Sequence, residues 1–217
     1  MKEAITIALP KGRLLAPAVR LFGRCGMNHR GIRADTRRLV FESKRGDVRF
    51  VIVRDRDVPT YVEYGAADMG VVGKDVLLEE ERDVYEPLDL KFGQCRLILA
   101  QPNGSRKGPR PLTSKIRVAT KYPNITERYF SEKGLAVEII KLYGSIELAP
   151  WAGLAEQIVD LIASGRTLRE NHLTAVETIA ESTARLIVNR ASLKLKYQQV
   201  TEVIHRLREK IEAVKPR

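Results

Sequence analysis

Short apolar segments alternate with amphipathic helical segments along much of this chain. Ile5–Leu9 predicts a buried strand, and the residues from Leu14 to about Cys25 place apolar side chains at helical spacing. The pattern repeats where a predicted strand at Asp68–Val72 runs into a helix opened by Gly73-Lys74-Asp75. Because strands joined through helices pair side by side and bury their faces under those helices, the alternation predicts an α/β fold.

The same periodicities predict the secondary structure of most of the remaining chain. Strands are predicted over residues 39–42, 49–53, 95–100, 117–120, 137–142, 158–162, 174–182 and 185–189. Helices are predicted over residues 57–64, 124–133 and 191–214, and a further helix is predicted to begin at Thr167. The side chains of Asp57, Asn124 and Asn189 are suited to capping the amino ends of the first three of these helices.

The bulk composition excludes several classes of protein. The 217 residues, 44% of them hydrophobic, are enough for one large domain or two small ones with cores of their own. No apolar run is long enough to span a membrane, and the amino terminus leads straight into a strand pattern without the features of a signal peptide. Cys25 and Cys95 are the only cysteines, and the three histidines are scattered. We therefore expect a soluble cytoplasmic protein with neither a disulfide framework nor a zinc site.

The formal net charge of +11 indicates anionic ligands. A nucleic-acid-binding protein would present a basic stripe or a recognisable binding module, whereas the basic residues here are spread along the chain. A positively lined cleft would instead concentrate small polyanions. We favour small polyanionic ligands over nucleic acid, and a basic surface that serves only solubility is the alternative.

The stretch from Glu156 to Leu168 predicts a phosphate site. A strand that ends at Ile162 is followed by Ser164 and Gly165, and a helix then begins near Thr167. Glycine permits a backbone conformation in which successive amide groups point inward, and a helix start adds unpaired N–H groups and a positive dipole end. An ordinary strand, turn and capped helix is the alternative interpretation of the same residues.

Two acidic residues precede this turn. Asp160 interrupts the apolar strand, and Glu156 comes four residues earlier. Carboxylates accept hydrogen bonds from sugar hydroxyls. Two acids followed by a phosphate cradle therefore suggest a sugar phosphate as the ligand.

Cations follow two further predicted strands. Lys11 and Arg13 lie just beyond the strand at Ile5–Leu9, and Arg54 directly follows the strand at Arg49–Val53. Open α/β sheets bind ligands at the carboxyl ends of their strands. These side chains are therefore candidates for phosphate binding, and charged surface positions at helix starts are the alternative.

Six segments in order resemble the short form of ATP phosphoribosyltransferase. They are the stretch from Glu156 to Leu168 and the segments at residues 5–14, 54–59, 67–75, 119–124 and 144–150. The resemblance extends from about Ile5 to Lys196, which is nearly the whole chain. It implies two α/β lobes of periplasmic-binding-protein (type II) character with a cleft between them. Residues 1–92 and 184–217 would form the first lobe, and residues 93–183 would form the second, which carries the phosphate cradle.

The resemblance also implies a reaction. N1 of the ATP adenine would attack C1 of phosphoribosyl pyrophosphate and release pyrophosphate, as the first step of histidine biosynthesis, with Mg²⁺ as cofactor. Because adenine N1 already carries a lone pair, no nucleophilic side chain is required. A non-catalytic, two-lobed module that binds anionic ligands is the alternative function.

Particular residues acquire roles from the same resemblance. Phosphoribosyl pyrophosphate would be bound by Glu156, Asp160, Ser164, Gly165, Arg166, Thr167 and Leu168. Arg54, with Lys11, would neutralise the leaving pyrophosphate, whereas ATP would be bound by Arg13, Arg37, Arg38, Thr120 and Tyr122. Either Arg37 or Arg38 would face the nucleotide. Two roles are open for Glu147: a contact to a sugar or to Mg²⁺, and a surface helix cap. Glu156 occupies a position where the family usually has Asp.

The implied partners are proteins. The resemblance to short forms implies a homodimer joined to a regulatory subunit similar to a histidyl-tRNA synthetase, and it implies that histidine does not inhibit this chain alone. The predicted helix over residues 191–214 carries an apolar stripe. That stripe is suited to packing on a partner or, as we favour, on the chain's own first lobe.

Overall fold

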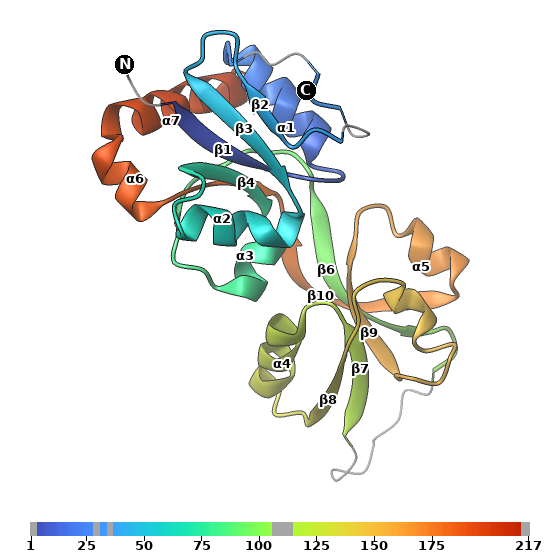
Figure 1. Ribbon diagram of the computed structural model, residues 1–217. Helices are drawn as coiled ribbons and strands as arrows, with labels where there is room; N and C mark the ends of the chain where they lie inside the picture. The colour runs from blue at the N-terminus through green and yellow to red at the C-terminus, as the bar shows by residue number, and fades with distance from the viewer. Residues whose placement is uncertain (1–3, 28–30, 34–36, 106–114, 214–217) are drawn as a thin grey trace. The chain divides into compact units, whose positions relative to one another are not determined.

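The computed structural model describes residues 4–27, 31–33, 37–105 and 115–213 (Figure 1). The chain divides into two compact units, which we call unit 1 (Met1–Gly93 with Thr183–Arg217) and unit 2 (Gln94–Ser182). Each unit has its own β-sheet packed against helices. The predicted α/β class is therefore confirmed.

Unit 1 is built on a six-stranded mixed sheet with the strand order β2-β3-β1-β4-β11-β5. Its strands are β1 (Ile5–Pro10), β2 (Val40–Glu42), β3 (Val48–Val53), β4 (Met69–Gly73), β5 (Tyr85–Asp89) and β11 (Ala184–Val188). Its helices are α1 (Leu15–Arg24), η1 (Asp55–Asp57), α2 (Val58–Glu63), α3 (Lys74–Glu80), α6 (Arg190–Leu195) and α7 (Tyr197–Glu212). Strands β3, β1 and β4 run parallel, so their carboxyl ends lie at one edge of the sheet.

Alternation along the strands of unit 1 gives the sheet two buried faces. Ile7 and Leu9 of β1 pack into the core that contains α1 and α7, whereas Ala8 packs with Val58 and Val62 of α2 on the opposite face. Successive strand residues point to opposite faces, and here each face is covered by helices. This burial explains why the central strands are continuous apolar runs.

The carboxyl-terminal segment of unit 1 differs from the single long helix predicted. Lys196 leaves the helical conformation (φ −117°, ψ 33°) and separates α6 from α7. Its Nζ lies 3.0 Å from Oδ1 of the buried Asp68, which also accepts a hydrogen bond from Ser192 Oγ at 2.7 Å. The capping role predicted for Asn189 is confirmed, because its side chain accepts a hydrogen bond from the amide of Ser192.

The apolar stripe of α7 packs on unit 1 itself. It consists of Val200, Val203, Ile204 and Leu207, which are buried in the same core as α1. The interpretation that this stripe covers the chain's own first lobe is therefore confirmed.

Unit 2 has a five-stranded sheet with the order β10-β6-β9-β7-β8. Its strands are β6 (Cys95–Pro102), β7 (Ile116–Thr120), β8 (Val137–Lys141), β9 (Gln157–Ile162) and β10 (Leu173–Ser182). Its helices are α4 (Pro123–Glu132), η2 (Ile146–Leu148) and α5 (Arg166–Glu170). Strands β8, β7 and β9 run parallel, and β6 is antiparallel to both β9 and β10. The loops that follow β7, β8 and β9 therefore meet at one edge of this sheet.

One further strand was missed, and one predicted cap was wrong. Strand β5 was not predicted, because Pro87 and three acidic residues lie within or beside a weakly apolar segment; it forms the sheet edge, where proline is tolerated. Asn124 does not cap α4, whose amino-terminal cap is Tyr122 with Pro123 in the first turn. Among the described residues, no helix is long and apolar enough to cross a membrane.

Candidate active site

The turn between β9 and α5 has the backbone conformation that the sequence suggested. Gly165 has φ +70°, in the left-handed region that favours glycine, and it is the amino-terminal cap residue of α5. The amide of Arg169 donates to the Gly165 carbonyl at 3.3 Å. The amide groups of the residues just before Arg169 therefore belong to the amino-terminal end of the helix, where N–H groups have no partner within the helix. Ser164 and Thr167 are exposed on this turn. Hydroxyl and amide donors therefore lie together where an anion could bind.

The other side chains of the turn have different surroundings. Leu168 is buried in the core of unit 2, so only its backbone could reach a ligand. Arg166 forms an exposed ion pair with Glu170 at 2.7 Å, and Arg169 Nη1 lies 3.5 Å from the carbonyl of Ser164. Two cations thus flank the turn, and Arg169 was not among the residues that the sequence singled out.

Asp160 lies near the carboxyl end of β9, before the turn. Its Oδ1 accepts the amide of Leu161 at 2.8 Å and lies 3.5 Å from Nζ of Lys121. Burial raises the pKa of Asp160 above its usual value, the positive charge of Lys121 partly offsets this, and the negative charge of Glu147 adds to it. Asp160, Lys121 and Glu147 therefore form one electrostatic cluster.

Glu147 lies on the segment that follows β8, and its negative charge acts on Asp160. It lies in η2 beside Ile146, which is buried in the core of unit 2 and fixes this short helix to the sheet. Carboxylate oxygens are the ligands that Mg²⁺ uses together with substrate phosphates. Among the described residues, no group of three or more His, Cys, Asp or Glu side chains is arranged to hold a metal ion.

The structure does not bring Glu156 to the turn. Its carboxylate accepts hydrogen bonds from the Arg117 amide (2.7 Å), Nε (3.0 Å) and Nη2 (2.7 Å). Burial alone would raise the pKa of Glu156, but the hydrogen bonds and charge of Arg117 outweigh it and hold the pKa below its usual value of 4.5. Glu156 precedes β9, and the turn follows the six residues of that strand, which span about 20 Å. Glu156 therefore belongs to the amino end of the strand.

Thr120 and Tyr122, predicted to contact ATP, are buried in unit 2. The Thr120 hydroxyl donates to the Val159 carbonyl at 2.8 Å and accepts the Tyr122 amide at 2.9 Å. These bonds join β7 to β9 and shape the loop that carries Lys121. Thr120 therefore positions the loop.

Lys11 and Arg54 lie side by side at the strand ends of unit 1. The Lys11 amide donates to the Val53 carbonyl at 2.8 Å, which places Lys11 next to the residue that precedes Arg54. Both side chains are exposed, and Gly12 continues the loop with φ +90°. Arg13 extends along the loop and donates from Nη1 to the Gly93 carbonyl at 2.7 Å. The predicted grouping of cations at these strand ends is thus present in the structure.

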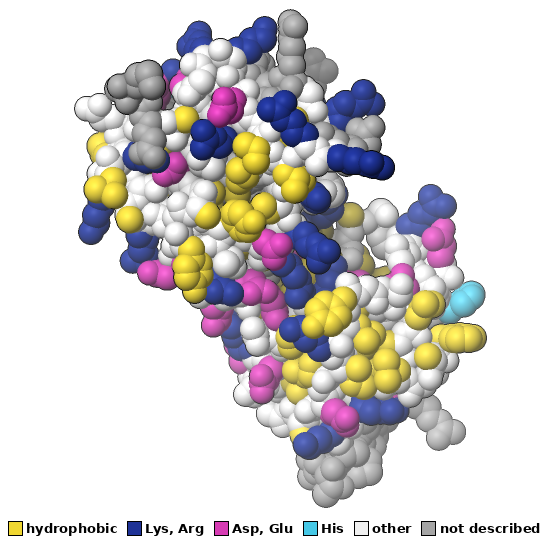
Figure 2. All heavy atoms as spheres, in the orientation of Figure 1, with side chains coloured by type: hydrophobic (Ala, Val, Ile, Leu, Met, Phe, Trp, Pro, Cys, Tyr) yellow, Lys and Arg dark blue, Asp and Glu magenta, His cyan; other side chains and the backbone are white. Residues whose placement is uncertain are grey.

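Arg37 and Arg38 are exposed and precede β2. Arg38 donates from Nε to the Val40 carbonyl at 2.7 Å and lies over the Phe41 ring at 5.3 Å. Arg38 is thus held against its own strand. Figure 2 shows Lys and Arg side chains dispersed over the viewed face of unit 1, without a single stripe.

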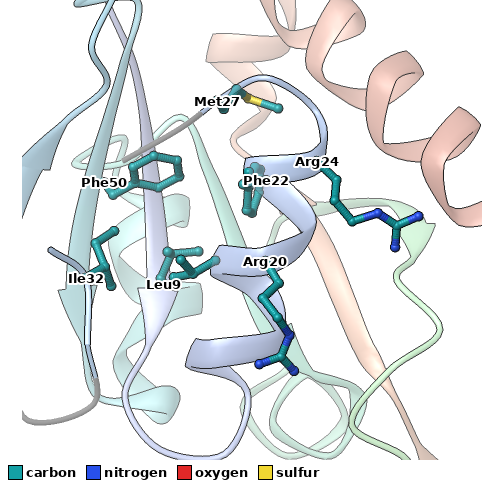
Figure 3. A pocket seen from close by; sticks show the side chains of 9 residues that line it. Leu9, Arg20, Phe22, Arg24, Met27, Ile32 and Phe50 are labelled. Carbon is teal, nitrogen blue, oxygen red and sulfur yellow. The ribbon is translucent and has the colours of Figure 1, made fainter. Parts of the chain in front are cut away.

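A cavity of about 440 Å³ lies in unit 1 between α1 and the sheet (Figure 3). Leu9, Phe22, Ile32 and Phe50 form its apolar wall, while Arg20 and Arg24 extend from α1 at its rim. None of the predicted site residues lines it. The cavity therefore does not coincide with the predicted phosphate-binding positions.

Besides Arg169, sequence reasoning missed two charged residues in unit 2. Lys121 directly follows β7, and Arg117 lies near its start. The sequence did contain a signal for Lys121, because this residue follows a strand as Lys11 does. It contained none for Arg117, because its partner Glu156 is 39 residues away.

Comparison with known proteins gives consistent results. The HisG family model, described as ATP phosphoribosyltransferase, matches residues 54–209. Proteins named ATP phosphoribosyltransferase from Geobacter metallireducens and Caldanaerobacter subterraneus are 59% and 52% identical to this chain; the alignments cover 95% and 96% of this chain and 98% of each relative.

Solved structures are also similar. The structure described as the ATP phosphoribosyl transferase (HisG:HisZ) complex from Thermotoga maritima matches with a TM-score of 0.83 and 37% identity, covering 96% of this chain and 99% of that chain. The substrate-binding protein of an amino acid ABC transporter matches with a TM-score of 0.61 and 13% identity, covering 97% and 94%. At this identity the second match shows the fold alone, and the predicted periplasmic-binding-protein character is confirmed.

Proposed function

Because this chain belongs to the ATP phosphoribosyltransferase (HisG) family, we propose that it joins N1 of the ATP adenine to C1 of phosphoribosyl pyrophosphate and releases pyrophosphate. This is the first step of histidine biosynthesis. The observation that carries the proposal is the similarity to named relatives over nearly the full length of both chains. The alternative of a non-catalytic binding module is not favoured, since it rests on fold similarity alone.

The phosphoribosyl group is assigned to unit 2. The amides that begin α5 and the hydroxyls of Ser164 and Thr167 bind the 5-phosphate, with Arg166 beside them. Asp160 accepts from a ribose hydroxyl. The support for these roles is the left-handed Gly165 and the position of Asp160 just before the turn.

The phosphate-binding cations are assigned to unit 1. Negative charge grows on the pyrophosphate as its bond to C1 breaks, and fixed cations stabilise that charge. The exposed side chains of Lys11 and Arg54 suit this task, with Arg54 as the main cation for the leaving group. Arg13, Arg37 and Arg38 remain candidates for the ATP phosphates.

Mg²⁺ fits the residues present in unit 2. Glu147 and Asp160 offer carboxylate oxygens, and the negative charge of Glu147 acts on Asp160. When bound, Mg²⁺ would neutralise charge on the pyrophosphate. Glu147 is the better ligand candidate, because Asp160 already has Lys121 as its counter-ion.

A protein partner is part of the proposal. The Thermotoga maritima relative is described in a complex with HisZ, and we infer that this chain also assembles as a homodimer with a histidyl-tRNA-synthetase-like subunit. Figure 2 shows hydrophobic side chains gathered on the viewed face of unit 2. Tyr143 and Trp151 of unit 2 are 85% and 89% exposed, which is typical of residues that become covered in an assembly. We propose that the complex is cytoplasmic.

The test is formation of the adduct. Purified chain is mixed with ATP, phosphoribosyl pyrophosphate and Mg²⁺, with and without the partner subunit, and near-ultraviolet absorption follows the altered adenine. We expect the absorption change in at least the complex. No change in either sample, with both proteins folded, would overturn the proposed activity.

A further inference from the structure

Lys121 lies beside Asp160 because of the register of two parallel strands. Thr120, the last residue of β7, is paired with Val159 of β9, so the next residues on the two strands are neighbours. The resulting Nζ to Oδ1 distance is 3.5 Å. The contact therefore follows from the sheet, which places Lys121 beside Asp160 and before the turn between β9 and α5.

The two carboxylate oxygens of Asp160 have different contacts. Oδ1 meets both the Lys121 ammonium and the amide of Leu161. Among the described residues, Oδ2 has no such contact. The carboxylate is thus held through Oδ1, which leaves Oδ2 to accept a hydrogen bond from a hydroxyl group.

The surroundings of this carboxylate oppose its charge. Asp160 has a side chain that is only 23% exposed, and the negative charge of Glu147 acts on it from η2. Lys121 is the cation that lies against this carboxylate, so its removal would leave Asp160 Oδ1 with the Leu161 amide and without a counter-ion among the contacts described above.

Lys121 is itself held in place. Its Nζ lies 5.3 Å from the centroid of the Tyr122 ring, and Tyr122 is buried. An ammonium group near an aromatic face is attracted to it. The cation is therefore restrained close to Asp160.

We propose that Lys121 is a positioning residue for phosphoribosyl pyrophosphate: it holds Oδ1 of Asp160 so that Oδ2 accepts a ribose hydroxyl. Lys121 acts through Asp160 and makes no contact with the phosphate. This rests on the proposed function, because it assigns the ribose to Asp160.

A double-mutant cycle separates this role from direct phosphate binding. The dissociation constant for phosphoribosyl pyrophosphate is measured by calorimetry for wild type, Lys121→Met, Asp160→Asn and the double variant. Loss of a charge-assisted contact predicts that Lys121→Met weakens binding about tenfold. In the Asp160→Asn background the same change should have almost no effect, and Lys121→Arg should restore most of the wild-type affinity.

Lys141→Met is the matched control. Lys141 is the last residue of β8, where it pairs with Thr120 of β7, and its Nζ lies 5.8 Å from the centroid of the Tyr143 ring. The variant removes the same charge from the same unit, and we expect near-normal affinity. Thermal melts show that each variant is folded.

Three results would overturn the inference. A full effect of Lys121→Met in the Asp160→Asn background would make Lys121 a direct phosphate ligand. Unchanged affinity in Lys121→Met beside a wild type that binds normally would remove its role while leaving the proposed function intact. A folded wild type that neither binds phosphoribosyl pyrophosphate nor forms the adduct would overturn both.

Discussion

Gly165 connects backbone conformation to ligand binding at the scale of one residue. A Cβ added there would be 3.6 Å from Arg169 Nη1, which is ordinary contact, so space is not the constraint. The constraint is φ +70°, which a β-branched residue adopts only with strain.

We predict that Gly165→Val weakens phosphoribosyl pyrophosphate binding while the fold survives. A left-handed conformation costs an L-residue about 1–2 kcal/mol, which corresponds to roughly 5- to 30-fold in affinity if the turn relaxes in the free protein. Calorimetry measures the affinity, and Gly165→Asn, which tolerates this conformation, is the control. Wild-type affinity in a folded Gly165→Val variant would show that the turn is not the phosphate site.

Arg54 gives a kinetic prediction at the same scale. If it stabilises charge that develops on pyrophosphate, Arg54→Ala should lower kcat more than it raises KM. Removal of one such electrostatic contact typically lowers kcat by about 10²- to 10³-fold. Steady-state rates measure the effect, and Arg54→Lys, which keeps the charge, should lose less. A normal kcat with only a raised KM would assign Arg54 to ground-state binding.

At the scale of elements, β9 carries different chemistry at its two ends. Near its carboxyl end are Asp160 and the turn, whereas its amino end is joined to β7 by the ion pair of Glu156 with Arg117. This pair lies beside Val118 and Gln157, the first register partners of the two parallel strands, and the strand ends near Lys121 and Asp160 lie beyond it.

We predict that Glu156→Gln lowers stability and leaves phosphoribosyl pyrophosphate affinity unchanged. The pKa of Glu156 is lower in the folded chain than its usual value of 4.5, so its contribution to stability is present above pH 4.5 and is lost as the pH falls through the lower folded-state pKa. The loss at neutral pH should be on the order of 1 kcal/mol or less, because both side chains are partly exposed.

Urea unfolding at pH 7 and below pH 4 tests this. The difference between wild type and Glu156→Gln should shrink at the lower pH. A large loss of ligand affinity with unchanged stability would instead support the ribose-binding role that the sequence suggested.

At the scale of the whole molecule, regulation is predicted to require the partner. This chain covers 99% of the Thermotoga maritima chain, which is described in a complex with HisZ. We therefore expect histidine to bind or inhibit the complex and to have no effect on the isolated chain.

Histidine titration by calorimetry measures this, first with the isolated chain and then with chain plus partner. Binding of phosphoribosyl pyrophosphate to the isolated chain serves as the control for a folded protein. Tight binding of histidine to the isolated chain would contradict the prediction.

Much of the fold follows from local pattern. The apolar strands of each unit, the helix after β1 and the cap at Asn189 were all predicted from side chains within a few residues of one another. Hydrophobic periodicity and capping chemistry are local, so they can be read without knowing what packs against them. The turn at Gly165 belongs to this group, because only its own residues set its backbone.

The pairings of charged side chains were decided by tertiary structure. Arg117 is 39 residues from Glu156 in the sequence, Lys196 is 128 from Asp68, and Lys121 meets Asp160 only because β7 and β9 are paired in one register. A carboxylate in a strand looks the same in the sequence whether it faces a ligand or an arginine. Which of these it meets depends on strand order and register, and those are set by packing across the whole sheet.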